Sequence, residues 1–459
     1  MVATSSTSSQ SFDIELDLIG QQPPLLMIYT QISLLYPVSD PSQYPTIVST
    51  LEQGLKRLSQ TFPWVAGQVK TEGVSEGNTG ISKIIPYEET PPLVVKDLRD
   101  DSSAPTIEGL RKAGFPIEMF DENVVAPKKT LAIGPGNGPN DPKPVLLLQL
   151  NFIKGGLILT INGQHGAMDM TGQDAIIRLL SKACRNESFT EEEVSAMNLE
   201  RKMVVPFLEN YKVGPELDHQ IVKPAPAGVA PPAPAKASWG FFSFTPKALS
   251  ELKDVATKTL DASTKFVSTD DALSAFIWQS ASRVRLARLD ASTPTEFCRA
   301  VDMRGPMGVS STYPGLLQNM TYHNSTVSEI ANEPLGATAS RLRSELNSDR
   351  LRRRTQALAT YMHDLPDKSS ISLTADADPS SGIMLSSWAK VGCWEYDFGF
   401  GLGKPESVRR PRFDPFESLV YLMPKKPDGE FTASISLRDE DMERLKADEE
   451  WTKYAQYIG

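Results

Sequence analysis

The sequence is poor in the residues that most often carry catalytic and metal-binding chemistry. Its 459 residues contain only 3 cysteines and 4 histidines. The odd number and wide spacing of Cys184, Cys298 and Cys393 argue against a disulfide framework and favour a reducing compartment. The chain contains no Cys-x-x-Cys and no His-Glu-x-x-His pattern, so the sequence predicts no metal site.

Long apolar runs, an excess of positive charge and nucleotide-binding loops are also missing. No apolar stretch approaches the ~18 residues that span a bilayer, and MVATSSTSSQS lacks the features of a secretory signal. The formal net charge of −10 argues against a nucleic-acid partner, which would need a basic face. No Walker loop and no Gly-x-Ser-x-Gly elbow is present. We expect a cytoplasmic protein with neither a membrane nor a nucleic-acid partner.

The composition is that of a globular protein with 40% hydrophobic and 23% charged residues. A chain of 459 residues is too long for a single hydrophobic core. Repeated prolines across 224–237 favour an extended linker. The sequence therefore predicts an N-terminal domain over 1–200, a crossover linker over 201–237 and a C-terminal domain over 238–459.

Hydrophobic periodicity predicts strands and helices in both halves of the chain. In the first half, the pattern predicts helices over 45–61 and 171–185, another helix from 190, and strands over 12–18, 64–70, 81–86, 145–153 and 157–162. In the second half, it predicts helices over 272–286, between 331 and 363 and at the C-terminus, and strands over 238–244, 296–302, 315–323, 381–388, 419–423 and 431–437. Residues 99–144 lack periodicity and are expected to form a functional loop or a wrap-around segment.

His165 is the only histidine that follows a strongly apolar strand and has a carboxylate at short spacing, in the stretch LILTINGQHGAMD. The neighbouring glycines, Gly163 and Gly166, allow a sharp turn or the close approach of a ligand. The pKa of an imidazole is already close to the range that a general base needs. Asp169 could orient the imidazole or pair with an arginine, and the spacing alone does not decide between these roles.

Two motifs, HGAMD at 165–169 and DFGFG at 397–401, occur in this order about half a chain apart. The ordered pair resembles the H-x-x-x-D and D-F-G-W-G motifs of the BAHD family of acyl-CoA-dependent acyltransferases. VDMR at 301–304 and SSW at 386–388 are further matches. The likeness extends over nearly the whole chain to a fungal branch that acetylates trichothecenes. Two departures are Phe400, which replaces the tryptophan of the motif, and Met170, which stands where glycine is common.

The resemblance implies an α/β fold of two similar mixed-sheet domains, as in chloramphenicol acetyltransferase, with an active-site tunnel between them. It implies that acetyl-CoA enters from one side as cosubstrate, that the acceptor alcohol enters from the other, and that no metal takes part. The implied acceptor is the C-3 hydroxyl of a trichothecene, a rigid and largely apolar sesquiterpenoid. The implied enzyme is a monomer that acts on small molecules only.

The resemblance also assigns supporting roles within the two motifs. It implies that Asp169 turns away from the pocket and pairs with Arg304, which overrides the orienting role. It further implies that Asp397, Gly399 and Gly401 are structural and lie far from the chemistry of acyl transfer.

Five further residues are implied to contact the substrates. Ser386 and Trp388 fall where a hydroxyl or an indole N–H could donate to a developing oxyanion, although packing in the wall is an equal alternative for Trp388. Lys265, Ser268 and Thr269 fall where relatives contact the phosphates of CoA. Ser268 is also a good helix cap, because Asp271 follows it at the spacing of a capping box.

In the implied mechanism, His165 takes the proton of the acceptor hydroxyl as the oxygen attacks the acetyl thioester. A tetrahedral oxyanion forms and collapses, and CoA thiolate leaves with the proton. No acyl-enzyme is needed, so both substrates are expected to bind together. The alternatives are an acyltransferase of the same fold that acts on another alcohol or amine, and a non-catalytic binder of a hydrophobic small molecule.

Overall fold

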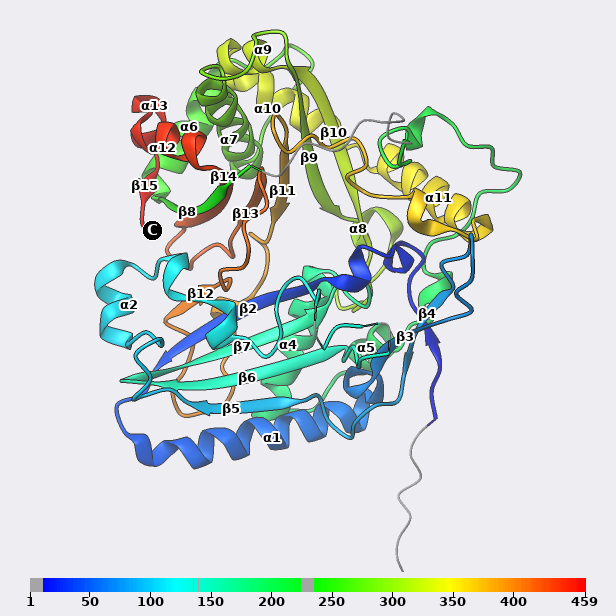
Figure 1. Ribbon diagram of the computed structural model, residues 1–459, viewed down its shortest axis with the longest axis vertical. Coiled ribbons are helices and arrows are strands. Elements are labelled where there is room, and N and C mark those ends of the chain that lie inside the picture. Colours follow the sequence, from blue (N-terminus) through cyan, green and yellow to red (C-terminus); the bar gives the residue numbers. More distant parts are fainter. Residues whose placement is uncertain (1–10, 135, 139, 224–234) are drawn as a thin grey trace, which may run out of the picture.

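The chain folds into two lobes that are stacked one above the other in Figure 1. The lower lobe is built on a five-stranded sheet and the upper lobe on a seven-stranded sheet, and helices pack on both. The predicted mixed α/β class is confirmed. The computed structural model describes residues 11–134, 136–138, 140–223 and 235–459. Most of the proline-rich segment, 224–234, lies outside the described residues, and the predicted domain limits stay a prediction.

The lower sheet has the strand order β12-β2-β7-β6-β5. Its centre is the predicted hairpin of β6 (Leu146–Ile153) and β7 (Gly156–Gln164), and β2 (Tyr29–Pro37) runs antiparallel to β7 over its full length. Every residue of β6 and β7 is buried. Helices α1 (Tyr44–Thr61) and α4 (Met170–Cys184) cover one face of the sheet, and both were predicted within one residue at each end.

The edge of the lower sheet is completed by a strand from far along the chain. β12 (Ser407–Arg409) pairs antiparallel with β2. The segment that leads to it buries Trp394, Phe398 and Phe400 in the core of the lower lobe. The second half of the chain therefore supplies part of the lobe that the first half mostly builds.

The upper sheet has the strand order β10-β9-β11-β13-β14-β8-β15. Apolar side chains of several helices pack on one of its faces, whereas the other face carries α11. The strands are β8 (Ala237–Phe244), β9 (Pro294–Asp302), β10 (Gln318–Thr326), β11 (Ile383–Ser387), β13 (Leu419–Leu422), β14 (Phe431–Arg438) and β15 (Gln456–Tyr457). The helices are α6 (Pro246–Lys258), α7 (Thr269–Arg285), α8 (Arg304–Met307), α9 (Val327–Asn332), α10 (Leu335–Ser344), α11 (Ser348–Asp364), α12 (Asp439–Ala447) and α13 (Glu449–Thr452).

Two predicted strands of the first half were too long. The strand expected over 12–18 is only β1 (Ile14–Glu15), because the chain soon turns into a 3-10 helix at Ile19–Gln21. The strand expected over 64–70 starts only at β3 (Gln68–Glu72), because a 3-10 turn occupies Pro63–Ala66. β1 and β3 flank β4 (Ile81–Ile85) in a separate three-stranded sheet.

The segment 99–144 contains regular structure that the sequence did not predict. α2 (Ile107–Ala113) and α3 (Glu122–Val125) are capped by Thr106 and Asp121, and both helices are too short to give a periodic pattern. β5 (Leu93–Asp97) and α5 (Glu191–Met197) complete the elements of the lower lobe. In the described part of the chain, no helix combines the length and the apolar character needed to cross a bilayer.

Candidate active site

His165 is the first residue after β7 and lies where the two lobes meet. Its backbone N–H donates to the carbonyl oxygen of Ile28 at 2.9 Å. Its ring Nδ1 lies 3.1 Å from the carbonyl oxygen of Met168. Because a carbonyl oxygen can only accept, Nδ1 carries the proton and Nε2 has a free lone pair. The imidazole is therefore held in the tautomer that can act as a base.

The surroundings of His165 keep the imidazole neutral. Burial lowers the pKa of His165 below its ordinary value. The Met168 carbonyl and the charge of Asp169 act in the opposite direction, and the positive charge of Arg410 lowers the pKa further. A neutral imidazole at neutral pH is the state that can take a proton from a hydroxyl group.

Gly166 is required by the close approach of two backbone segments. A Cβ atom added to Gly20 would lie 2.1 Å from the carbonyl oxygen of Gly166, and one added to Gly166 would lie 2.6 Å from Leu26 Cδ2. A side chain at either position would push the loop away from its neighbours. Close packing of the loop thus explains this glycine without any ligand.

Asp169 is fully engaged in bonds that hold the start of α4. It caps the helix by accepting from the N–H of Gly172 at 2.8 Å. Arg304 donates to its two carboxylate oxygens at 2.9 and 3.0 Å, and the N–H of Leu317 donates to Oδ2 at 2.8 Å. The predicted pair with Arg304 is therefore present, and the carboxylate anchors the loop.

The Asp169–Arg304 pair joins the two lobes. Both side chains are at most 4% exposed. Arg304 also donates to the carbonyl oxygens of Tyr313 at 2.9 Å and Gly315 at 2.8 Å. A Cβ atom on Gly172 would lie 2.1 Å from the carbonyl oxygen of Pro314, so α4 touches this upper-lobe segment directly.

A second buried pair holds the other side of the loop, and the sequence reasoning missed it. Arg201 donates to the carbonyl oxygen of Ala167 and lies 3.4 Å from Asp17 Oδ2. Asp17 also accepts from the Tyr313 hydroxyl and, at 3.1 Å, from the N–H of Leu316. In the alternating pattern FDIELDL, Asp17 resembles a solvent-facing residue, and nothing marks Arg201 as its partner.

Ser386 and Trp388 form one hydrogen-bonded unit at the end of β11. The Trp388 indole N–H donates to Ser386 Oγ at 3.1 Å, and Trp388 is only 3% exposed. The indole donor is therefore already used, whereas the hydroxyl hydrogen of Ser386 stays available. This geometry favours Ser386 as the donor to an oxyanion and Trp388 as the group that fixes the Ser386 hydroxyl.

Ser268 is the N-cap of α7, as the capping-box pattern predicted. Its Oγ accepts from the N–H of Asp271 at 3.1 Å, and the Asp271 carboxylate accepts from its N–H at 2.8 Å. Ser268 also lines a cleft of about 790 Å³ that reaches Met170 and Trp388. Of the three predicted CoA contacts, only Ser268 is among the described residues that line this cleft. Lys265 is exposed and Thr269 is half-buried, and both lie outside the cleft.

Asp397, Gly399 and Gly401 lie at the opposite end of α4 from His165. Asp397 Oδ1 accepts from the N–H of Gly399 at 2.8 Å, and Arg185, just past α4, donates to the Asp397 carbonyl. Gly399 and Gly401 have φ angles of 70° and 76°, which glycine adopts readily. The 15 residues of α4 span about 22 Å, so this motif is remote from the imidazole.

The two departures from the family motifs are accommodated by packing. Phe400 is 5% exposed and meets Tyr36 edge-on at 5.9 Å between ring centroids, so the phenyl ring is packed in the core. Met170 is the first residue of α4 and lines the cleft, and the helix begins normally at its cap.

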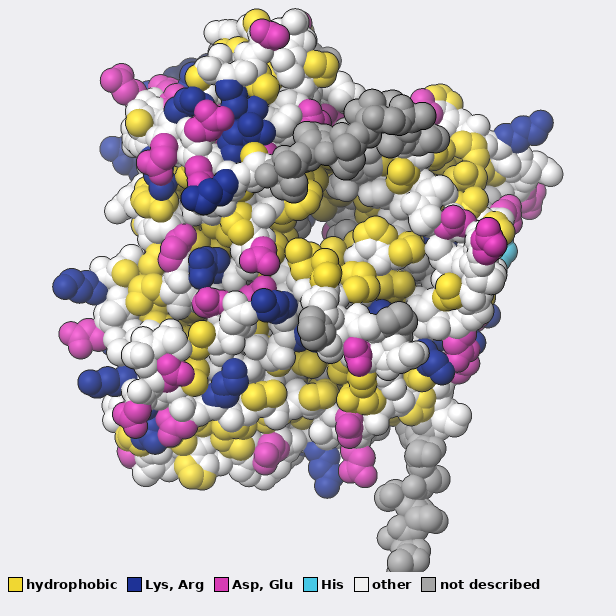
Figure 2. Space-filling model, in the orientation of Figure 1, with side chains coloured by type: hydrophobic (Ala, Val, Ile, Leu, Met, Phe, Trp, Pro, Cys, Tyr) yellow, Lys and Arg dark blue, Asp and Glu magenta, His cyan; other side chains and the backbone are white. Residues whose placement is uncertain are grey.

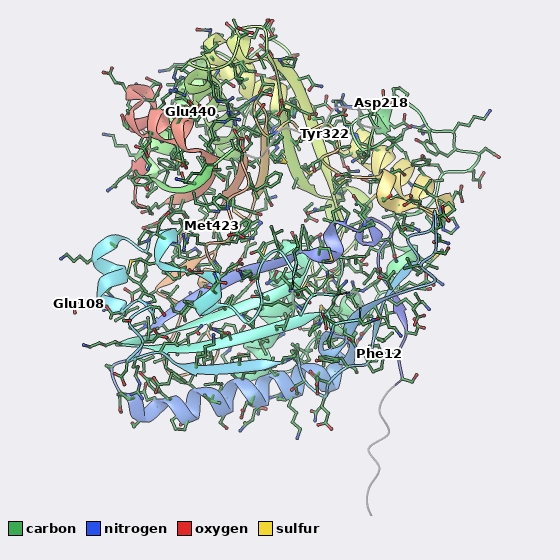
Figure 3. All side chains as sticks on the ribbon, viewed as in Figure 1. Phe12, Glu108, Asp218, Tyr322, Met423 and Glu440 are labelled. Atoms are coloured by element: carbon green, nitrogen blue, oxygen red, sulfur yellow. The ribbon has the colours of Figure 1, made fainter. Side chains whose placement is uncertain are left out.

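The boundary between the lobes is where the substrates would have to meet. Figure 2 shows a hollow between the lobes with many hydrophobic side chains around it. Met423, labelled in Figure 3, follows a strand of the upper sheet and is buried in the core of the lower lobe. Among the described residues, no group of three or more His, Cys, Asp or Glu side chains could hold a metal. A neutral base at this boundary could take a proton from a hydroxyl group of a bound substrate.

Comparison with known proteins gives the family. Residues 28–184 match the trichothecene 3-O-acetyltransferase-like N-terminal domain, and residues 130–452 match the transferase family. The sequence is 93% identical over 459 residues to trichothecene 3-O-acetyltransferase TRI101 of Fusarium sporotrichioides, covering 100% of both chains. The chain belongs to this transferase family of acyl-CoA-dependent O-acyltransferases, as its two motifs predicted.

Solved structures confirm the predicted fold. The crystal structure of F. sporotrichioides TRI101 complexed with coenzyme A and T-2 has a TM-score of 0.94 at 90% identity and covers 98% of this chain and 100% of that chain. The crystal structure of F. graminearum TRI101 complexed with coenzyme A and deoxynivalenol has a TM-score of 0.95 at 75% identity, with the same coverage of 98% and 100%.

Proposed function

We propose that this enzyme transfers the acetyl group of acetyl-CoA to the C-3 hydroxyl of trichothecenes and so protects the cell from the toxin. The observation that carries the proposal is the neutral His165 at the lobe boundary of a chain 93% identical to a trichothecene 3-O-acetyltransferase. Relatives complexed with coenzyme A together with T-2 or deoxynivalenol support both substrate classes.

In the proposed reaction, His165 transfers the proton and Ser386 stabilises the oxyanion. His165 Nε2 takes the proton of the acceptor hydroxyl as the oxygen attacks the thioester carbon. The bond from Nδ1 to the Met168 carbonyl holds the ring and stabilises the imidazolium that forms. The Ser386 hydroxyl, fixed by Trp388, donates to the oxyanion. The oxyanion then collapses, and the CoA thiolate leaves and takes the proton from His165.

The cleft beside the start of α4 is the proposed entrance for acetyl-CoA. It leads from the N-terminus of α7 to Trp388, and the cations in its wall include exposed Lys390, whereas Arg299 and Arg343 are both paired with Asp271. Positive side chains suit the phosphates of CoA. Ser268 at the cleft, with Lys265 and Thr269 nearby in sequence, stays a proposed contact of CoA. No metal is needed, because the imidazole moves the proton without one.

We also propose that the enzyme acts as a monomer in the cytoplasm. His165, Ser386 and Arg304 all belong to one chain, so the proposed site needs no second subunit. Size-exclusion chromatography with light scattering and the location of a tagged protein test these two points.

The proposed reaction is tested with two matched acceptors. The enzyme is mixed with acetyl-CoA and a trichothecene that has a free C-3 hydroxyl, and free thiol and acetylated product are measured. The control acceptor is the same trichothecene already acetylated at C-3. We expect thiol release and a singly acetylated product with the first acceptor only. Equal thiol release with the control, or none with either, would contradict the proposal.

A further inference from the structure

Arg410 is a buried cation with no ion pair in the described part of the chain. It is 2% exposed. Its hydrogen bonds to the carbonyl of Pro411 and to Thr130 Oγ1 are long, at 3.3 and 3.4 Å, and its Nε has no hydrogen-bond partner. The Tyr421 hydroxyl is a further hydrogen-bond partner, and the charge of buried Glu122 offsets part of the positive charge. A guanidinium has five N–H donors, so some of them still have no acceptor. Folding rarely leaves a buried charge uncompensated, because its desolvation is costly.

Aromatic rings make this buried charge tolerable. The Arg410 guanidinium carbon lies 3.8 Å from the ring centroid of Phe413, 4.7 Å from that of Tyr421 and 5.9 Å from that of Trp388. The negative faces of the rings attract the cation. A guanidinium that stacks on rings still presents its N–H groups in its own plane, so they can reach an oxygen atom.

Arg410 and His165 approach the same end of the lower sheet. Arg410 follows β12 and His165 follows β7, and these two strands flank β2 on its two sides. Thr130, which Arg410 contacts, accepts the N–H of Tyr29 at 2.8 Å, and the adjacent Ile28 accepts the N–H of His165 at 2.9 Å. The charge of Arg410 acts on the imidazole across this short span.

We propose that Arg410 is a further catalytic residue, whose unused N–H groups donate to the oxyanion that forms on the acetyl carbonyl. This inference rests on the proposed function. When the acceptor oxygen bonds to the carbonyl carbon, the π pair moves to the carbonyl oxygen and His165 takes the hydroxyl proton. When the intermediate collapses, the pair restores the C=O bond, the C–S bond breaks and the thiolate takes the proton.

A fixed cation suits this task because it needs no reorganisation as charge develops. Arg410 lies over Trp388, and Trp388 fixes the Ser386 hydroxyl, so the two proposed oxyanion donors belong to one cluster. The same positive charge also lowers the pKa of His165, in addition to the larger effect of burial. Asp169, whose charge has the opposite effect on the imidazole, is paired with Arg304.

The test compares two adjacent buried arginines. Arg410→Met removes the guanidinium at a similar length, and Arg410→Lys keeps the charge. Arg409→Met is the matched control, because Arg409 is 3% exposed but donates to the Phe115 carbonyl at 2.9 Å. Melting temperature, kcat and KM for acetyl-CoA are measured for each. We expect Arg410→Met to lower kcat by about 10²–10³ with little change in KM, Arg410→Lys to lie between, and Arg409→Met to keep most of kcat.

The pH profile gives a second readout that packing alone would not change. In Arg410→Met, the apparent pKa on the acid side of the kcat/KM profile should rise, because the cation no longer opposes protonation of His165. Arg410→Gln takes the place of the Met variant if that variant does not fold.

The inference would be overturned if folded Arg410→Met or Arg410→Gln kept both the kcat and the acid-side pKa of the wild type. It would also be overturned if Arg409→Met lost as much kcat as Arg410→Met. A wild-type enzyme without turnover would instead refute the proposed function.

Discussion

A single backbone carbonyl decides the chemistry of His165. Met168 lies three residues further along the loop, and its oxygen occupies Nδ1 of the ring. In a triad this position belongs to a carboxylate, which orients the base and stabilises its charged form. Here the nearby carboxylate of Asp169 is committed to Arg304 and to the cap of α4. The base is therefore oriented by the fold of its own loop.

Replacing His165 should remove catalysis and leave the fold intact. The ring makes one hydrogen bond to the backbone, so His165→Ala should change the melting temperature little. The loss of a general base should lower kcat by roughly 10²–10⁴. His363→Ala is the control, because His363 is exposed on α11 and stacks on Phe207. Near-normal kcat in folded His165→Ala would remove His165 from the mechanism.

The pH dependence of the reaction should report the lowered pKa of His165. The base works only when neutral, so kcat/KM is constant above this pKa and falls as the pH drops through it. Because burial lowers the pKa, the acid midpoint should lie below 6.5, the ordinary value for histidine. A midpoint above 6.5 in the kcat/KM profile would contradict the burial of a neutral imidazole.

The loop between β7 and α4 is held by two buried ion pairs, one on each side. Asp169–Arg304 and Asp17–Arg201 both reach the segment 313–317 of the upper lobe. A change in the relative position of the two lobes would therefore move the loop and, with it, His165.

Breaking the first of these pairs should destabilise the protein strongly. Arg304→Ala leaves Asp169 buried without its partner, which should cost about 3–5 kcal/mol. Asp302→Asn is the control, because its side chain is 43% exposed although it also pairs with Arg304, and its loss should cost less than about 1 kcal/mol. Denaturant unfolding measures both. Similar losses for the two variants would show that burial of the pair is unimportant.

The glycines of the DFGFG motif should matter for stability and not for rate. Gly399→Ala places a Cβ atom on a residue with φ of 70° and 3.2 Å from Arg185 Cγ, which should cost about 1–2 kcal/mol. Gly305→Ala is the control, because a Cβ atom there meets open space. We expect kcat of folded Gly399→Ala to match that of the wild type. A selective loss of kcat would place the motif in the chemistry.

The cysteines of the two lobes are poor candidates for a covalent intermediate, so direct transfer of the acetyl group is the expected route. Burial raises the pKa of Cys184 to about 12, and it also raises the pKa of Cys298 and Cys393. None of the three thiols is therefore a ready nucleophile. Acetyl-CoA alone should give no burst of free thiol, and release should begin when the acceptor is added. A stoichiometric burst without acceptor in a rapid-mixing experiment would indicate an acyl-enzyme.

The parts of the fold with strong local signals were predictable from the sequence. The apolar face of α1 and the apolar strands and glycine turn of the β6–β7 hairpin allowed these elements to be placed within two residues. Short elements such as α2 and α3 give no periodic signal. The pairing of β12 with β2 was not predictable, because strand register between distant segments leaves no local trace.

Some residues of the site were also predictable from the sequence, and others were not. His165 was evident because it is rare and follows an apolar strand, and Arg304 was found through a motif shared with a family. Asp17, Arg201 and Arg410 were missed, because each is one of many charged residues and only the folded chain shows that it is buried. Burial of a charged group depends on contacts between distant segments, and composition does not reveal it.

The return of β12 to the lower sheet has a consequence for biosynthesis. Ribosomes release the N-terminal part first, at about 5–20 residues per second, so β2 emerges long before its outer neighbour. For roughly 10–45 seconds the nascent first lobe presents an unpaired apolar edge, which invites association with other strands. Rapid synthesis of the segment between the first lobe and β12 thus protects the yield of soluble enzyme, and truncation before Ser407 should make the chain aggregate.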